Sequence, residues 1–98
     1  MEKDFYYVEL FELYKDLLTE KQRELFESHY IFDLSFAEIS DPNGTSRQSV
    51  SVALKKVRSK LAEYESKLQL FKKNQQLRQV ANELDKEFGD KILEIIGR

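Results

Sequence analysis

Five residues near the middle of the chain have the side chains and the spacing of a nucleic-acid contact. They are Arg47, Gln48, Ser51, Lys55 and Arg58. If this segment is a helix, Arg47, Gln48 and Ser51 would reach base edges from its first turns. Lys55 and Arg58 follow along the same face, where cationic groups meet phosphates. The alternative is an exposed helix that binds nothing, in which Arg47 and Gln48 are ordinary first-turn residues.

The charge of the chain changes sign at this segment. Residues 1–44 carry four basic and eleven acidic residues, residues 45–62 carry five basic and no acidic ones, and residues 63–98 carry seven of each. The net charge of −2 argues against sequence-blind binding of nucleic acid by the whole protein. Lys56 and Lys60 belong to the basic block, so they are either further phosphate contacts or part of a solvated helix face.

Other kinds of chemistry have little support in the sequence. Without Cys there is no disulfide and no thiolate ligand. His29 is the single His and has no neighbouring ligand, so we expect no metal and no cofactor. The carboxylates are scattered, and there is no phosphate loop or nucleophile elbow, so we predict that the protein is not an enzyme. Met1–Asp4 does not resemble a signal peptide, and no apolar run suits a membrane span, which favours a cytoplasmic protein without membrane insertion.

The elements that must position these residues are helices, so the predicted fold class is all-α. A wide apolar stripe at spacings of three and four predicts a helix from Asp4 to Leu18, covered on more than one side. Thr19–Gln22 and Ser35–Glu38 each have the form of a capping box, which predicts two more helix starts. His29 is expected at the edge of the apolar face of the second helix.

Residues 35–60 read as a helix-turn-helix unit. Pro42 is expected to end the first helix because it disfavours a helical conformation at Asp41. Asn43 and Gly44 accept positive φ, and Ser46 is the expected N-cap of the second helix. The predicted shared core is Ile39, Val50 and Leu54, with the small Ala37 where the helices cross. Val52 points away from that core, either toward a partner or a base methyl group, or as an isolated surface residue.

The second helix of the unit continues into a long helical pattern. The pattern loses phase between Phe71 and Leu77, where we predict a break before a final helix that carries Leu77, Val80, Ala81, Leu84 and Phe88, followed by an apolar patch at Ile92–Ile96. We therefore predict a helical domain over residues 1–71 and a long C-terminal helical extension over residues 72–98. The 61–71 stripe is either a dimer seam or a face packed on the first two helices, and residues 77–96 either fold back or complete the dimer.

Several of these motifs together resemble one known family. The motifs are Leu18-Thr19-x-Lys21-Gln22, Tyr30, Asp33-Leu34-Ser35-x-Ala37-Glu38-Ile39, Ser46-Arg47-Gln48-x-Val50 and Leu61-x-x-Tyr64-Glu65-x-Lys67-Leu68. In this combination, over about residues 5–71, the sequence is similar to the YlxM/UPF0122 family of small bacterial proteins with a helix-turn-helix like that of sigma-factor region 4. Genes of the family accompany those of the signal recognition particle GTPases. The resemblance implies a cytoplasmic, dimeric regulator of the signal recognition particle pathway.

The turn departs from the family pattern, and it leaves two hypotheses for function. Such units place bulky apolar residues at the positions of Asn43 and Thr45, so we expect the second helix at an altered angle. The first hypothesis is a regulatory helix-turn-helix protein that binds DNA or the RNA of the signal recognition particle. The alternative is a protein-interaction module that modulates a signal recognition particle GTPase without reading DNA, through its aromatic N-terminal helix, with Phe5 and Phe11, or through its acidic N-terminal face.

Overall fold

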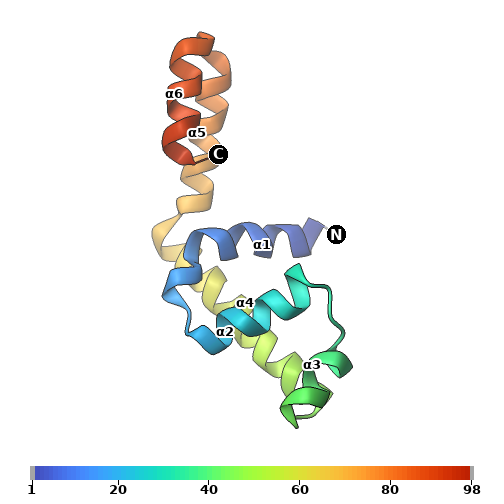
Figure 1. Cartoon of the computed structure of the whole chain (residues 1–98). Coiled ribbons are helices and arrows are strands. Elements are labelled where there is room, and N and C mark those ends of the chain that lie inside the picture. The colour runs from blue at the N-terminus through green and yellow to red at the C-terminus, as the bar shows by residue number, and fades with distance from the viewer. Residues whose placement is uncertain (1, 98) are drawn as a thin grey trace. The chain divides into compact units, whose positions relative to one another are not determined.

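The computed structural model describes residues 2–97, and every regular element among them is helical. The prediction of an all-α fold is confirmed. The α-helices are α1 (Glu2–Tyr14), α2 (Glu20–Phe26), α3 (Phe36–Asn43), α4 (Arg47–Leu68), α5 (Leu70–Glu83) and α6 (Lys86–Ile96) (Figure 1). Two short elements join them: the 3₁₀ turn η1 (Lys15–Leu17) and the π-helical segment η2 (Glu27–Ile31). No helix in this range is both long and apolar enough to cross a membrane.

The chain folds as two compact units that divide between Lys67 and Leu68. This division lies close to the predicted boundary after residue 71. The N-terminal unit holds α1 to α3 and nearly all of α4, and therefore the whole helix-turn-helix. The C-terminal unit holds α5 and α6.

The core of the N-terminal unit draws side chains from all four of its α-helices. Its buried apolar residues are Leu10, Phe11, Tyr14, Leu18, Phe26, Ile39, Val50, Leu54, Val57 and Leu61. Burying one such side chain contributes about 1.5–3 kcal/mol, so these contacts are the main force that holds α4 in place. The apolar stripe that runs through α1 and η1 is only partly covered within this unit, because Phe5 in α1 and Leu17 in η1 remain more than half exposed.

Tyrosine hydroxyls tie the second half of α4 to α1 and η1. The Tyr14 hydroxyl donates to Oε1 of Glu65 at 2.6 Å, and the Tyr64 hydroxyl donates to the Leu17 carbonyl at 3.2 Å. Burial raises the pKa of Tyr6, and the Glu65 carboxylate and Tyr7 raise it further. The neutral phenol is therefore the form that suits the folded unit at ordinary pH.

Both predicted capping boxes are confirmed. The Thr19 hydroxyl accepts from the Gln22 N–H at 3.1 Å, and the Gln22 side chain accepts from the Thr19 N–H at 3.0 Å. Ser35 and Glu38 make the same pair of bonds at 3.1 and 2.9 Å. These local bonds fix where α2 and α3 begin, since each satisfies two N–H groups that a helix start leaves free.

The prediction that Pro42 ends the first helix of the unit is wrong. α3 continues through Asp41 and Pro42 to Asn43. Pro42 lies in the last turn, where losing one backbone hydrogen bond costs little, and the Asn43 side chain donates to the Ile39 carbonyl at 2.7 Å. Gly44 ends the helix with φ +68°, so its predicted positive φ is confirmed, whereas Asn43 stays helical.

The start of α4 agrees with the sequence, but the breaks after it do not. The Ser46 hydroxyl accepts from the Ser49 N–H at 3.0 Å, which confirms Ser46 as the N-cap. The helix breaks at Gln69, with φ +56°, and not between residues 71 and 77, which lie within α5. The second break follows at Leu84, so Phe88 belongs to α6. A polar run can continue a helix, because one helix face can be wholly solvated.

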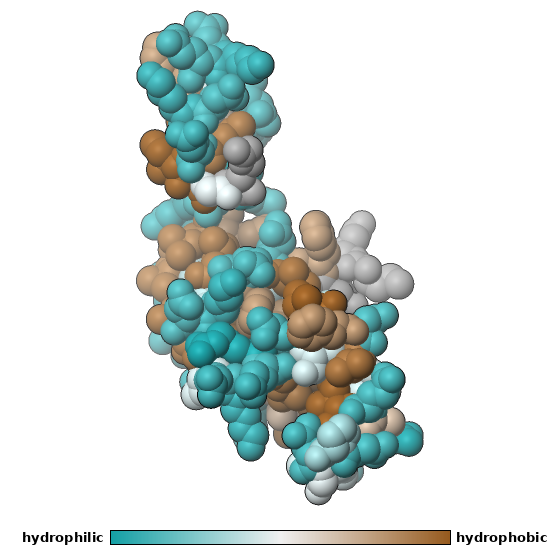
Figure 2. Space-filling model, in the orientation of Figure 1, coloured by the Kyte–Doolittle hydropathy of each residue, from teal (hydrophilic) through white to brown (hydrophobic). Residues whose placement is uncertain are grey.

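The C-terminal unit is a hairpin in which α5 and α6 lie side by side (Figure 1). They meet at Ala81 and Gly89, which are both buried. A Cβ added to Gly89 would lie 2.4 Å from the carbonyl oxygen of Ala81, so only glycine permits this approach. Figure 2 shows apolar surface on the hairpin among hydrophilic surface. The exposed large apolar residues of the C-terminal unit are Leu68, Leu70, Leu77, Val80, Leu84, Phe88 and Ile95.

Candidate nucleic-acid interface

The side of α4 that faces solvent follows from the side that is buried. Val50, Leu54, Val57 and Leu61 are buried along one side of the helix. A helix turns by about 100° per residue, so the opposite side carries residues half a turn away. We call this exposed set the outer stripe; it consists of Gln48, Val52, Lys55, Lys56 and Ser59. Its first residue, Gln48, lies four residues after Gly44.

The structure brings two of the five predicted residues onto the outer stripe and places three beside it. Gln48 and Lys55 belong to the stripe and are exposed. Arg47 is exposed at the start of α4, on the flank of the stripe. Ser51 and Arg58 lie along the same flank and are half-buried. The five residues therefore do not form one flat face.

Sequence reasoning left three stripe residues, Val52, Lys56 and Ser59, out of the predicted set, although the first two carry a recognisable signal. Val52 is 50% exposed and points away from the core, as predicted. Lys56 is exposed and adjoins Lys55. Val52 forms a ridge between two shallow depressions. One, of about 440 Å³, is lined by Ser46, Gln48, Ser49, Val52, Ala53 and Lys56. The other, of about 350 Å³, is lined by Gln22, Val52, Lys55, Lys56, Ser59 and Lys60.

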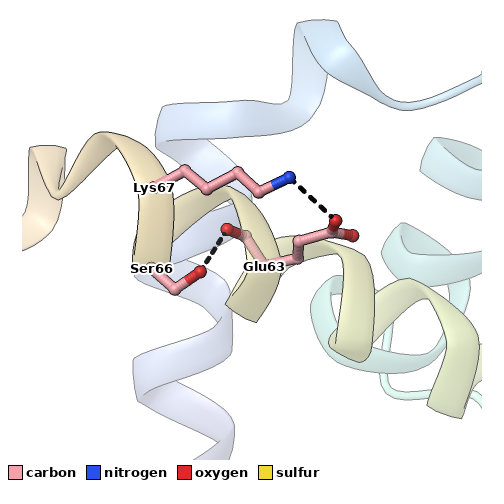
Figure 3. A network of polar contacts seen from close by, with 3 residues as sticks. All are labelled: Glu63, Ser66 and Lys67. Atoms are coloured by element: carbon pink, nitrogen blue, oxygen red, sulfur yellow. Dashed lines mark hydrogen bonds and ion pairs between the residues drawn. The ribbon is translucent and has the colours of Figure 1, made fainter.

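The lysines of the outer stripe carry charge that no carboxylate of the described residues neutralises. Ion pairs of the described residues include Lys15–Glu12 and Lys67–Glu63, and neither involves Lys55 or Lys56. Lys67, in the last turn of α4, binds Oε2 of Glu63 at 3.2 Å, and the Ser66 hydroxyl donates to the Glu63 carbonyl at 2.7 Å (Figure 3). Lys67 is therefore held within its own helix, whereas Lys55 and Lys56 remain available to an anion.

The unusual turn residues line a groove on another side of the helix-turn-helix. Asn43 and Thr45 stand where bulky apolar anchors are usual, and the space beside them, about 660 Å³, stays open. Ile39 and Val50 form part of its floor, and Phe32, which is 68% exposed, stands at its wall. The other lining residues are Lys21, Glu24, Leu25, Glu27, Ser28, Ser49 and Ala53. The groove is mixed in charge, unlike the outer stripe.

His29 has a structural role at the end of η2. Its Nδ1 lies 2.8 Å from the Leu34 carbonyl oxygen, so the ring donates there. The ring also contacts Tyr30 and Phe36, at centroid distances of 5.1 and 4.9 Å. No cluster of ligands within the described part of the chain could hold a metal ion. His29 thus secures the connector that leads to α3.

Comparison with known proteins gives one consistent result. Residues 1–95 match the sequence model of the UPF0122 family, described as "Putative helix-turn-helix protein, YlxM / p13 like". A UPF0122 protein of Caldanaerobacter subterraneus is 47% identical over 78 residues, which cover 79% of this chain and 67% of that protein. One of Thermoanaerobacter sp. is 44% identical over 87 residues (88% and 72%), and one of Ureaplasma urealyticum is 42% identical over 72 residues (74% and 73%).

Proposed function

Because this chain belongs to the UPF0122 family of helix-turn-helix proteins, we propose that it binds nucleic acid through the outer stripe of α4. The observation that carries the proposal is the pair of exposed, unpaired lysines, Lys55 and Lys56, beside Gln48 and the Val52 ridge. When lysines contact phosphates, they displace the counterions condensed on the nucleic acid, and this release drives binding. Gln48 would contact base edges, and Val52 would meet apolar parts of the nucleic acid.

We also propose where the protein acts and which nucleic acid it binds. The protein acts in the bacterial cytoplasm, as a regulator in the signal recognition particle pathway, and by binding rather than by catalysis. Its nucleic acid is the RNA of the particle or a DNA operator. Arg47 and Ser51, on the flank of the outer stripe, add contacts when the nucleic acid wraps around α4.

Replacing Lys55 and Lys56 together by Ala is expected to weaken binding and to make it less salt-dependent. Each phosphate contact contributes about 0.9 to the slope of log K against log salt on DNA, so losing two lowers that slope by about 1.8. The measurement is fluorescence anisotropy of a labelled DNA duplex and of the particle's RNA over a salt series. The matched control is Lys73→Ala with Lys86→Ala, two exposed lysines of the C-terminal unit. Equal affinity and slope in both double variants would refute the proposal.

We also propose that two copies of the chain pair through the C-terminal unit. Leu77 and Val80 are three residues apart on one side of α5, and both are exposed, as are Leu84 at the break after α5 and Phe88 on α6. A hairpin of two short helices with this much uncovered apolar surface gains from a second copy.

Light scattering at micromolar concentration is expected to give the mass of a dimer. Leu77→Lys with Val80→Lys should give a monomer, because two charges cannot be buried between the two copies without partners. Asn82→Lys, an exposed change on the same helix, should stay dimeric. A monomeric wild-type protein under these conditions would exclude this interface.

The second candidate function is a protein-interaction module that modulates a signal recognition particle GTPase. Exposed aromatic rings favour it: Phe5 is 67% exposed on α1, and Phe32 stands at the wall of the 660 Å³ groove. Phe11 is buried, so it is part of the core and not of a contact surface.

Surface plasmon resonance with the purified GTPase tests this second candidate. Phe5→Ala, or Asn43→Leu with Thr45→Leu to fill the groove, is expected to lower the affinity at least about tenfold, since exposed aromatic anchors dominate such contacts. Both variants should keep the wild-type affinity for nucleic acid. No association of the wild-type protein with the GTPase would rule this candidate out.

A further inference from the structure

Arg58 is joined to a residue 28 positions earlier in the chain. Its Nη1 donates to the hydroxyl oxygen of Tyr30 at 2.8 Å, and both residues are half-buried. Tyr30 belongs to η2, and Arg58 lies about three turns after the start of α4. This bond therefore connects the candidate interface to the packing behind it.

The aromatic ring of Tyr30 is held in place by other aromatic side chains. It stacks on Phe26 with a centroid distance of 4.3 Å and an angle of 17°, and Phe26 stacks on Phe11 at 4.3 Å and 11°. His29 meets the edge of the same ring. Phe11 and Phe26 are fully buried, so the position of the Tyr30 hydroxyl is fixed by the core.

The π-helical turn contributes to this placement. In η2 the Phe32 N–H donates to the Glu27 carbonyl at 2.9 Å, a bond across five residues instead of four. Such a turn holds one more residue than an α-helical turn, and π turns occur often at functional sites. Here it brings Tyr30 onto the stacked column and its hydroxyl to Arg58.

We propose that Tyr30 is a positioning residue that presents the guanidinium of Arg58 to a phosphate of the bound nucleic acid. This inference rests on the proposed function. A guanidinium has five N–H groups, and the bond to Tyr30 uses one of them, so others remain for phosphate oxygens. A side chain that is already held in place loses less conformational entropy on binding than a free arginine. Because the hydroxyl of Tyr30 acts through Arg58, its loss has no effect on binding once Arg58 is gone.

The test is a double-mutant cycle on binding, with a labelled DNA duplex and a labelled RNA hairpin as the probes. Tyr30→Phe removes the hydroxyl and keeps the ring on its stack, so the fold is retained. It is expected to weaken binding about three- to tenfold, the range of one hydrogen bond. Arg58→Ala should weaken binding further and lower the salt slope on DNA by about 0.9. Tyr30→Phe added to Arg58→Ala should cost nothing more.

The outcomes separate this inference from the proposed function. Tyr64→Phe is the matched control, because it removes a hydroxyl that donates to the Leu17 carbonyl at 3.2 Å, and it should bind like the wild type. If the wild-type protein binds neither probe, the proposed function itself fails. If the wild type binds and Tyr30→Phe changes only the thermal stability, Tyr30 is purely structural and the inference is overturned. Equal losses from Tyr30→Phe with and without Arg58 would also overturn it.

Discussion

Phe26→Ala is expected to lower the free energy of unfolding of the N-terminal unit by about 3–5 kcal/mol, the usual cost of deleting a buried phenyl ring. Phe26 is fully buried and stacks between Phe11 and Tyr30, at 4.3 Å from each. Its removal leaves a cavity bounded by two rigid rings, which are poorly able to close it. A domain of this size has only about 5–15 kcal/mol of stability in total, so the variant is expected to be partly unfolded at 37 °C.

Urea titration followed by tyrosine fluorescence measures this effect in one unit alone. All five Tyr lie between residues 6 and 64, and the chain has no Trp, so the signal comes from the N-terminal unit. Phe32→Ala is the matched control, because it deletes the same side chain where it is 68% exposed, and it should cost less than about 1 kcal/mol. Similar losses in the two variants would contradict the central place of Phe26 in the core.

Gly89→Ala is expected to separate α5 from α6, although alanine favours a helix over glycine by about 1 kcal/mol. The new Cβ would lie 2.4 Å from the Ala81 carbonyl oxygen, which is a backbone atom and cannot rotate away. Overpacking of this kind costs about 1–3 kcal/mol, and a small hairpin has little stability to lose. The steric cost therefore outweighs the gain in helix propensity.

Hydrogen exchange followed by mass spectrometry should show lost protection over residues 70–96 and unchanged protection in the N-terminal unit. Asp90→Ala is the control: it is an exposed neighbour in the same helix, and it should leave exchange unchanged or slow it slightly. Slower exchange in Gly89→Ala than in the wild type would mean that the two helices are not packed as closely as the structure has them.

Features that depend on neighbouring residues were predictable from the sequence. The caps at Thr19, Ser35 and Ser46 arise from bonds that span three residues, and Gly44 adopts the positive φ that its missing side chain allows. The buried side of α4 follows from apolar spacing. Because the exposed side is its complement, Lys55 and Val52 could be assigned to solvent before the structure was known.

Features that depend on distant residues, or on a small balance of local energies, were not predictable. The bond from Arg58 to Tyr30 joins side chains 28 residues apart, so no spacing in the sequence signals it. Pro42 stays within α3 because the Asn43 side chain and Gly44 together satisfy the end of that helix. Gln69 adopts φ +56°, which costs a non-glycine residue energy that only the fold on either side can offset.

The π-helical turn makes the length of one segment a determinant of the whole N-terminal unit. Each residue of an α-helix adds about 100° of rotation. Deleting one residue within Glu27–Ile31 would therefore convert the π-helical turn to an α-helical one and rotate the helices before it relative to the helices after it. Tyr30 could then not lie on Phe26 and reach Arg58 at once. Insertions and deletions are usually tolerated at junctions between helices, but here a change of one residue is expected to be more damaging than most substitutions. Related sequences should therefore conserve the number of residues between Phe26 and Ser35 more strictly than their identity.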